Sequence, residues 1–232
     1  MRTPTPAAPL AIAAVALAPL GLAACGGSED ATSTPTATTG APASRCEQVE
    51  APESKQVKLK PPKRRVGIAG NITATVQTNC GNFEIKLDTR EFPKTARSFV
   101  YMVDHGVYDD TTFHRVVSDF VIQGGDPKGT GSGDAGYTIR EEPPVDTAYT
   151  RGTVAMAKTA VEPPGTSGSQ FFVVTEADAG LQPDYAVLGK VVGGESTIDA
   201  IEAQADPSLG PEGGKPVSPV VTERIKLEHV TG

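Results

Sequence analysis

The sequence predicts a mainly β fold: a closed antiparallel barrel of about eight short strands, capped by two α-helices. Two observations carry this prediction. Many short segments alternate between apolar and polar residues, which is typical of strands that are half buried. Only two segments have helical spacing, one after the first pair of strands and one before the last strand. A closed barrel would bury the apolar face of every strand.

The first elements are a hairpin and a helix. "NITATVQT" and "NFEIKLD" alternate with a period of two residues, and the turn sequence "NCG" separates them. Helical spacing follows in "EFPKTARSFVYMVDHG", where Pro93 suits the first turn and Gly106 suits the C-terminal stop. The residues that share the apolar face of this helix are Phe92, Ala96, Phe99, Val100 and Val103.

Short strands and a second helix complete the pattern. A glycine-rich loop, "GGDPKGTGSGDAGY", follows the predicted strand "FVIQ". No internal repeat is visible. The predicted strands are "TTFHRVV", "FVIQ", "GTVAMAK", "SQFFVVT" and "YAVLGKVV", followed by the helix "ESTIDAIEAQA" and the closing strand "PVVTERIKLEHV".

The N-terminus has the features of an export signal. Arg2 precedes the apolar run "LAIAAVALAPLGLAA", which is short for a membrane span and predicts a signal peptide over residues 1–24. "LAAC", ending at Cys25, resembles the lipobox of bacterial lipoproteins, in which the cysteine is diacylated. The alternative is an ordinary signal peptide, with Cys25 lost on cleavage. The favoured interpretation places the protein on the outer face of the bacterial cytoplasmic membrane, held there by a lipidated Cys25.

Residues 25–65 are predicted to be the lipidated cysteine and a flexible linker. The first part is poor in large apolar residues, and the second is charged and contains proline. Its basic residues could lie on an anionic surface, but a solvated linker is favoured. Residues 66–232 fit one domain with a sizeable core. Loss of the signal changes the formal charge from −7 to −8, which argues against nucleic acid as a partner.

Two cysteines remain after Cys25. Cys46 lies in the predicted linker and Cys80 in the predicted first hairpin. In an exported protein these two residues are candidates for a disulfide, which would join the linker to the hairpin. Two unpaired thiols are the alternative.

Polar residues interrupt otherwise apolar strands. Arg115 lies in "TTFHRVV", and alternation places it on one face with Val117, opposite His114. Gln123 ends the next strand and Gln170 precedes "FFVV". An unpaired charge is costly away from water, so these residues predict a shallow apolar site with a few hydrogen-bonding groups.

The segments "FHRVVSDFVIQGGD" and "GSQFFVVT" together resemble the two signature segments of the cyclophilins, a family of peptidyl-prolyl cis/trans isomerases. The resemblance covers about Thr73 to Val230, including the order of helices and strands. It implies an eight-stranded barrel with two capping helices. It also implies a groove on the outer surface of the barrel, where proline-containing peptides bind and react without a cofactor or metal ion.

The resemblance also implies a role for each site residue. Arg115 would donate a hydrogen bond to the proline nitrogen of the twisted peptide bond, and Gln123 would orient the guanidinium and bind the substrate. The other implied contacts are the proline-ring pocket of Phe120, Val121, Phe172 and Leu181, the peptide-holding backbone of Ala157 and Lys158 with Gln170, and Tyr185, which falls where many members carry a histidine.

Two departures from the family pattern concern the edge of this groove. Gly180 stands where many members have a tryptophan, and "KTAVEPPGTSGSQ" replaces a shorter Asn-rich loop. The family's cyclic-peptide inhibitor, cyclosporin, is an implied ligand. Both departures would alter its binding and the substrate range more than the basic reaction.

The leading hypothesis is therefore a membrane-anchored prolyl isomerase that assists the folding of exported proteins. The alternative is a non-catalytic module of the same fold that binds proline peptides or acts as an envelope scaffold. A hydrolase is disfavoured because none of the three histidines belongs to a recognisable nucleophile motif. The glycine-rich loop lacks the ending of a phosphate-binding loop, and the acidic spacing of a calcium loop is absent.

Overall fold

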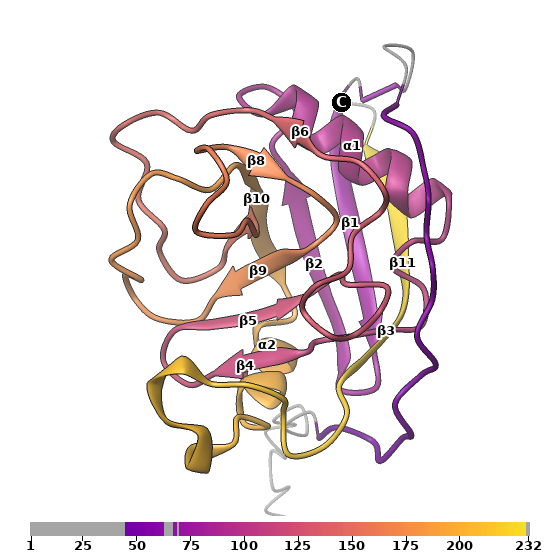
Figure 1. The fold of residues 1–232 in the computed structure, drawn as a ribbon, viewed down its shortest axis with the longest axis vertical. Helices are drawn as coiled ribbons and strands as arrows, with labels where there is room; N and C mark the ends of the chain where they lie inside the picture. The colour runs from indigo at the N-terminus through magenta and orange to yellow at the C-terminus, as the bar shows by residue number, and fades with distance from the viewer. Residues whose placement is uncertain (1–44, 63–66, 69, 231–232) are drawn as a thin grey trace, which may run out of the picture. The chain divides into compact units, whose positions relative to one another are not determined.

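A computed structural model describes residues 45–62, 67–68 and 70–230. Within these ranges the protein is mainly β, with one nine-stranded antiparallel sheet and a separate two-stranded sheet. Helix α1 (Pro93–Asp104) and helix α2 (Glu195–Glu202) lie at opposite ends of the large sheet (Figure 1). No helix in the described ranges is long and apolar enough to span a bilayer. The predicted signal peptide and Cys25 lie outside the described residues.

The strands pair in an order that differs from their order in the sequence. The smaller sheet consists of β6 (Ile139–Arg140) and β8 (Thr166–Ser167). From one edge to the other, the large sheet consists of β3 (Thr111–Thr112), β11 (Val221–Val230), β1 (Asn71–Thr78), β2 (Gly81–Leu87), β10 (Val187–Gly193), β7 (Thr153–Met156), β9 (Phe171–Val174), β5 (Val121–Gly124) and β4 (Arg115–Val117).

The predicted antiparallel β fold with two helices is confirmed, and so is the first hairpin, in which Thr73 pairs with Lys86. The predicted single strand "TTFHRVV" is instead broken at Phe113 and His114 into β3 and β4, the two edges of the sheet. The sheet curls into a half-barrel, and no ladder of described residues joins β3 to β4. The closed eight-stranded barrel therefore stays a prediction.

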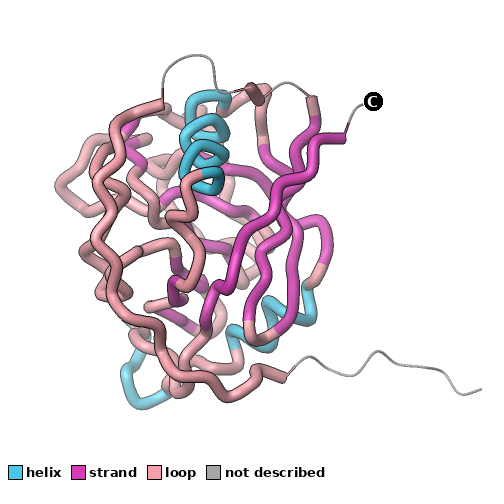
Figure 2. The backbone as a smooth tube through the Cα atoms, turned by 90° about the vertical axis from the view of Figure 1, so that its right-hand side faces the viewer, coloured by secondary structure: helices cyan, strands magenta, loops and turns pink. Residues whose placement is uncertain are grey.

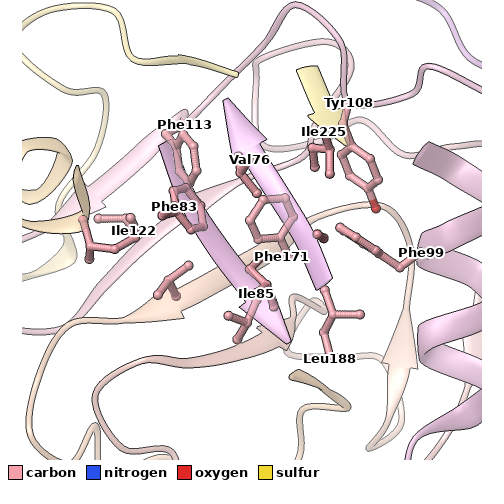
Figure 3. Packing of buried hydrophobic residues seen from close by; sticks show 14 of the residues in the cluster. Val76, Phe83, Ile85, Phe99, Tyr108, Phe113, Ile122, Phe171, Leu188 and Ile225 are labelled. Atoms are coloured by element: carbon pink, nitrogen blue, oxygen red, sulfur yellow. The ribbon is translucent and has the colours of Figure 1, made fainter. Parts of the chain in front are cut away.

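The core fills the inside of the curled sheet. Alternate residues of β1 and β2 point inward because side chains of a strand alternate between its faces. Phe171 packs at its centre, with ring centroids 6.2 Å from Phe99 and 6.0 Å from Phe113 (Figure 3). Aromatic rings in such edge-to-face contacts contribute more than their buried area alone. This core holds the rigid strands on which the site is built.

An extended segment, residues 45–62, lies along the outside of the domain; we call it the strap. Figure 2 shows it as a long loop that runs the length of the domain past α1. A disulfide joins Cys46 to Cys80 in the turn between β1 and β2, as the sequence predicted. Val57 and Leu59 pack against the core. This part of the predicted flexible linker is thus attached to the domain, because its few apolar residues and one cysteine find partners there.

Candidate active site

Arg115 and Gln123, two of the polar residues that interrupt apolar strands in the sequence, lie opposite each other. Strands β4 and β5 form a hairpin in which Arg115 pairs with Gln123, and Val117 pairs with Val121. Asp119 in the turn has a positive φ of 53°, which asparagine and aspartate adopt more readily than most residues. The tight turn therefore sets the register that brings the guanidinium and the amide to one face.

Nine of the ten residues predicted for peptide binding and catalysis surround one cavity of about 180 Å³. The tenth, Gln170, lies in a neighbouring cavity of about 170 Å³, which shares Gln123, Ala157 and Lys158 with the first. The residues around the first cavity are Arg115, Phe120, Val121, Gln123, Ala157, Lys158, Phe172, Leu181 and Tyr185. The structure thus brings together residues from three strands, β4, β5 and β9, and from the loops around them.

One wall of this cavity is apolar and well supported. Phe172 is only 4% exposed, and its ring is perpendicular to that of Tyr185 at a centroid distance of 5.3 Å. These rings belong to a second apolar cluster, separate from the main core. Val121 and Leu181 are also part of this second cluster. The alternation of β9 explains the separation, because Phe171 points into the main core and Phe172 points toward the cavity.

Tyr149 supports this wall and was missed by the sequence reasoning. Its hydroxyl accepts a hydrogen bond from the Tyr185 N–H at 3.0 Å and donates one to the Tyr185 carbonyl at 2.6 Å. Burial raises the pKa of Tyr149 to about 12, so the hydroxyl keeps the proton that it donates. The backbone of Tyr185 is therefore held from behind.

Arg115 is held by a residue far away in the sequence. Its Nε donates to the carbonyl of Glu212 at 3.0 Å, and its guanidinium carbon lies 5.9 Å from the centroid of the Phe120 ring. Glu212 ends the 3-10 helix η1 (Pro207–Glu212), and the segment after it pairs with β4 through a Val116 N–H to Gly214 carbonyl bond of 2.9 Å. We predicted that Gln123 orients the guanidinium of Arg115. In the structure the guanidinium is held instead by the backbone carbonyl of Glu212.

Gln123 instead belongs to a pair of glutamines. Its Nε2 donates to Oε1 of Gln170 at 2.9 Å. The Nε2 of Gln170 donates in turn to the carbonyls of Gly131 and Gly133, at 3.0 and 2.9 Å. The two amides therefore link β5 and the start of β9 to the glycine-rich loop.

Lys158 and Ala157 also have partners within the protein. The Lys158 side chain is only 5% exposed, and its Nζ donates to the carbonyls of Thr159 and Glu162 and lies 3.7 Å from the carboxylate of Asp184. The N–H of Ala157 donates to the carbonyl of Gln170 at 2.9 Å. Lys158 thus ties the altered loop to the segment that carries Tyr185, a role that was not predicted.

A buried carboxylate organises the glycine-rich loop. Asp126 has no exposed surface, and its side chain accepts hydrogen bonds of 2.6–3.1 Å from the backbone N–H groups of Lys128, Thr130, Gly131 and Gly133. Burial raises the pKa of Asp126, but these four N–H groups together outweigh it and leave the pKa below its ordinary value of 3.8. The folded protein therefore favours the charged form.

We expect Asp126 to make the protein sensitive to acid. Because its pKa is lowered by folding, its contribution to stability is fully present above the unfolded pKa of 3.8 and is lost as the pH falls through the folded pKa. Asp126→Asn should lower the free energy of unfolding at neutral pH by about 2 kcal/mol, because the amide replaces an acceptor with a donor.

Urea unfolding between pH 7 and pH 3 measures both effects. The Asp126→Asn variant should lose less stability than the wild type on acidification, so the two curves should converge. Asp146→Asn, an exposed carboxylate in a loop, is the control. Parallel curves for wild type and Asp126→Asn would show that the carboxylate has no such role.

The described residues contain no cluster of three or more His, Cys, Asp or Glu side chains that could hold a metal ion.

Gly180 has a positive φ of 60°, and nothing lies within 4 Å of the position that its Cβ would take. The rim beside Leu181 is therefore open where many relatives are expected to carry tryptophan. The arrangement consists of two cations, Arg115 and Lys158, two linked amides and an apolar wall.

Comparison with known proteins agrees with this arrangement. The family model "Cyclophilin type peptidyl-prolyl cis-trans isomerase/CLD" matches residues 73–228. The peptidyl-prolyl cis-trans isomerase B of Streptomyces anulatus is 36% identical over 179 residues, covering 69% of this chain and 99% of that protein. The probable peptidyl-prolyl cis-trans isomerase B of Mycobacterium tuberculosis is 34% identical over 212 residues, covering 84% of this chain and 66% of that protein.

A third relative is much longer. The peptidyl-prolyl cis-trans isomerase-like 2 of Cryptococcus neoformans is 38% identical over 160 residues, and the match covers 66% of this chain but only 27% of that protein. A crystal structure of a cyclophilin type isomerase from Cryptosporidium parvum has a TM-score of 0.62 and 30% identity, covering 69% of this chain and 99% of that one. A second crystal structure of that isomerase, obtained in the presence of the dipeptide Ala-Pro, has a TM-score of 0.61. The chain belongs to the family of cyclophilin-type peptidyl-prolyl cis-trans isomerases.

Proposed function

We propose that this protein catalyses cis–trans isomerisation of the peptide bond before proline. The observation that carries the proposal is the cavity in which the Arg115 guanidinium lies beside the apolar wall of Phe120 and Phe172. An apolar wall suits a proline ring, and a fixed cation beside it suits an amide whose nitrogen becomes more basic during rotation. The Cryptosporidium relative crystallised with Ala-Pro adds support from within the family.

The chemistry needs no nucleophile. Rotation about a peptide bond is opposed by about 18–20 kcal/mol of lost resonance, and at the twisted geometry the proline nitrogen regains a localised lone pair. A guanidinium donor directed at that nitrogen binds the twisted state more strongly than the planar one, which is the condition for catalysis. The guanidinium stays protonated at working pH, so Arg115 donates without any pKa adjustment.

The supports seen in the structure allow Arg115 to act in this way. Its Nε is occupied by the carbonyl of Glu212, which fixes the plane of the guanidinium. A preorganised donor does not have to reorient as the substrate reacts. A thousandfold acceleration requires about 4 kcal/mol of such stabilisation.

The test of this proposal is an isomerisation assay on the purified chain with an X–Pro peptide. We expect relaxation between cis and trans forms to be at least a hundredfold faster than without protein. If the protein binds the peptide and relaxation stays at the spontaneous rate, the chain is a proline-peptide-binding module instead. That outcome would favour the alternative named in the sequence analysis.

We further propose that the protein works at the cell envelope. The predicted signal peptide, the "LAAC" segment ending at Cys25 and the Cys46–Cys80 disulfide all suit an exported lipoprotein. Its clients would be exported proteins whose folding waits for slow X–Pro isomerisation. Cyclosporin-type ligands would bind in the same cavity, with the open rim at Gly180 reducing the surface that they can contact.

Cys25→Ala tests the anchor. If Cys25 is lipidated, the variant should leave the membrane fraction for the medium, or accumulate as an unprocessed precursor. Cell fractionation followed by immunoblotting measures this, and Cys46→Ala, which removes a cysteine without touching the lipobox, is the control. A Cys25→Ala protein that fractionates and migrates like wild type would show that Cys25 carries no lipid.

A further inference from the structure

The strap, residues 45–62, is attached near both ends of the glycine-rich loop, residues 124–137. The N–H of Lys55 donates to the carbonyl of Pro127 at 2.9 Å, and the N–H of Leu59 donates to the carbonyl of Ala135 at 2.7 Å. Gly136 lies so close that its Cβ, if it had one, would be 2.9 Å from Lys58 Cα. One extended segment therefore holds the start and the end of the loop.

The loop between these two points is a single hydrogen-bonded unit. The buried carboxylate of Asp126 gathers N–H groups from Lys128 to Gly133, so that the loop is organised around one centre. The approach is tight, because a Cβ at Gly133 would overlap the Asp126 side chain. We expect a unit of this kind to move as a whole, so that a displacement of its ends would shift its middle.

The middle of the loop touches the candidate active site. The carbonyls of Gly131 and Gly133 accept hydrogen bonds from Gln170, whose Oε1 accepts from Gln123. Gln123 borders the cavity of Arg115 and Phe172. A continuous series of contacts thus runs from the strap, through the loop and Gln170, to the wall of the cavity.

We infer that the strap is a positioning element of the active site: by holding the glycine-rich loop, it sets where Gln170 and Gln123 stand and so how tightly peptide binds. The inference rests on the proposed isomerase function. Arg115 is held separately, by Glu212 on another segment, so the strap acts on binding and leaves the rotation step largely unaffected. The disulfide at Cys46 keeps the strap in place by fixing its end to the domain.

Leu59→Pro tests this inference because proline lacks the N–H that bonds to Ala135; it is compared with Leu59→Ala, which loses the same packing against the core but keeps the N–H. The control is Glu53→Pro in the same extended segment, since Glu53 is exposed and makes no hydrogen bond with any described residue.

A second test variant, Cys46→Ala/Cys80→Ala, removes the covalent attachment of the strap and leaves only the two hydrogen bonds between Glu47 and Asn79 at that end, without changing any residue that touches the loop. Thermal unfolding of each variant confirms that the domain is folded before other measurements.

Two readouts are measured on each folded variant. For Leu59→Pro we expect KM for an X–Pro peptide to rise at least threefold while kcat stays within twofold, and the double cysteine variant should change in the same direction. Hydrogen exchange at the Gly131 and Gly133 amides should become at least tenfold faster, because both donate to Asp126 in the loop. Glu53→Pro should match the wild type in both readouts.

The outcomes separate this inference from the proposed function. A wild-type protein without isomerase activity would defeat the proposed function, and the dissociation constant of an Ala-Pro peptide would then replace KM as the readout. If the wild type is active and Leu59→Pro and the double variant keep its KM, the strap does not position the site. Hydrogen exchange at the Gly131 and Gly133 amides that stays unchanged in both variants would also overturn the inference. So would variants in which only kcat changes.

Discussion

Replacing Arg115 with lysine or alanine should lower kcat/KM on an X–Pro peptide at least tenfold, which is about 1.4 kcal/mol or more of transition-state stabilisation. Lysine keeps the charge, but its single ammonium cannot stay bonded to the Glu212 carbonyl and also present a second, fixed N–H group to the substrate nitrogen. Peptide affinity should fall much less, because the apolar wall holds the proline ring in both states.

The same variants should keep nearly the thermal midpoint of the wild type. Among described residues, Arg115 makes no ion pair, and the Glu212 carbonyl that it would abandon belongs to an exposed residue that water can reach. Arg140→Lys, an exposed arginine outside the cavity, is the matched control and should leave the kinetics unchanged. An Arg115→Ala protein that isomerises at the wild-type rate, or unfolds many degrees earlier, would show that this arginine is structural.

The site features that could be predicted from the sequence are those fixed by local geometry. Alternation along the strand placed Arg115 and Val117 on the same face, and the hairpin register brings Gln123 opposite Arg115. The signature segments then identified the apolar residues, and the structure places these around one cavity. A period of two residues, once started, determines the direction of every side chain in the strand.

The partners of these residues could not be predicted in this way. Glu212 lies 97 residues from Arg115 in a segment without periodicity, and its contact is made by a backbone carbonyl, which every residue possesses. The hydrogen bond between Gln123 and Gln170 depends on the pairing of β5 with β9, which brings the two residues together. Such contacts depend on tertiary packing and leave no local signal in the sequence.

The attachment of the strap could not be predicted from the sequence either. Its composition is charged and rich in proline, so the sequence predicted a flexible linker up to residue 65. Its attachment depends on the disulfide, on the packing of Val57 and Leu59, and on backbone hydrogen bonds such as those of Lys55 and Leu59. Only a few side chains, Cys46, Val57 and Leu59, add to the backbone contacts, so the overall composition of the segment still resembles that of a linker.

Phe172→Leu should weaken peptide binding at least fivefold, or about 1 kcal/mol, and kcat/KM should fall by the same factor. Leucine removes the flat ring that would lie against the proline ring, and also the perpendicular contact with Tyr185. The rotation step should be little affected, because Arg115 keeps its own support at Glu212. Titration with an X–Pro peptide and steady-state kinetics measure the two quantities.

The neighbouring residue provides the matched control. Phe171 precedes Phe172 on β9 and points into the main core, where its ring lies 5.9–6.2 Å from those of Phe99, Tyr108 and Phe113. Phe171→Leu removes the same atoms, so it should cost more stability and leave peptide affinity near wild type. If both variants lose affinity equally, the loss reflects general loosening of the large sheet. Loss of affinity with Phe172→Leu alone would place the proline ring against this face of β9.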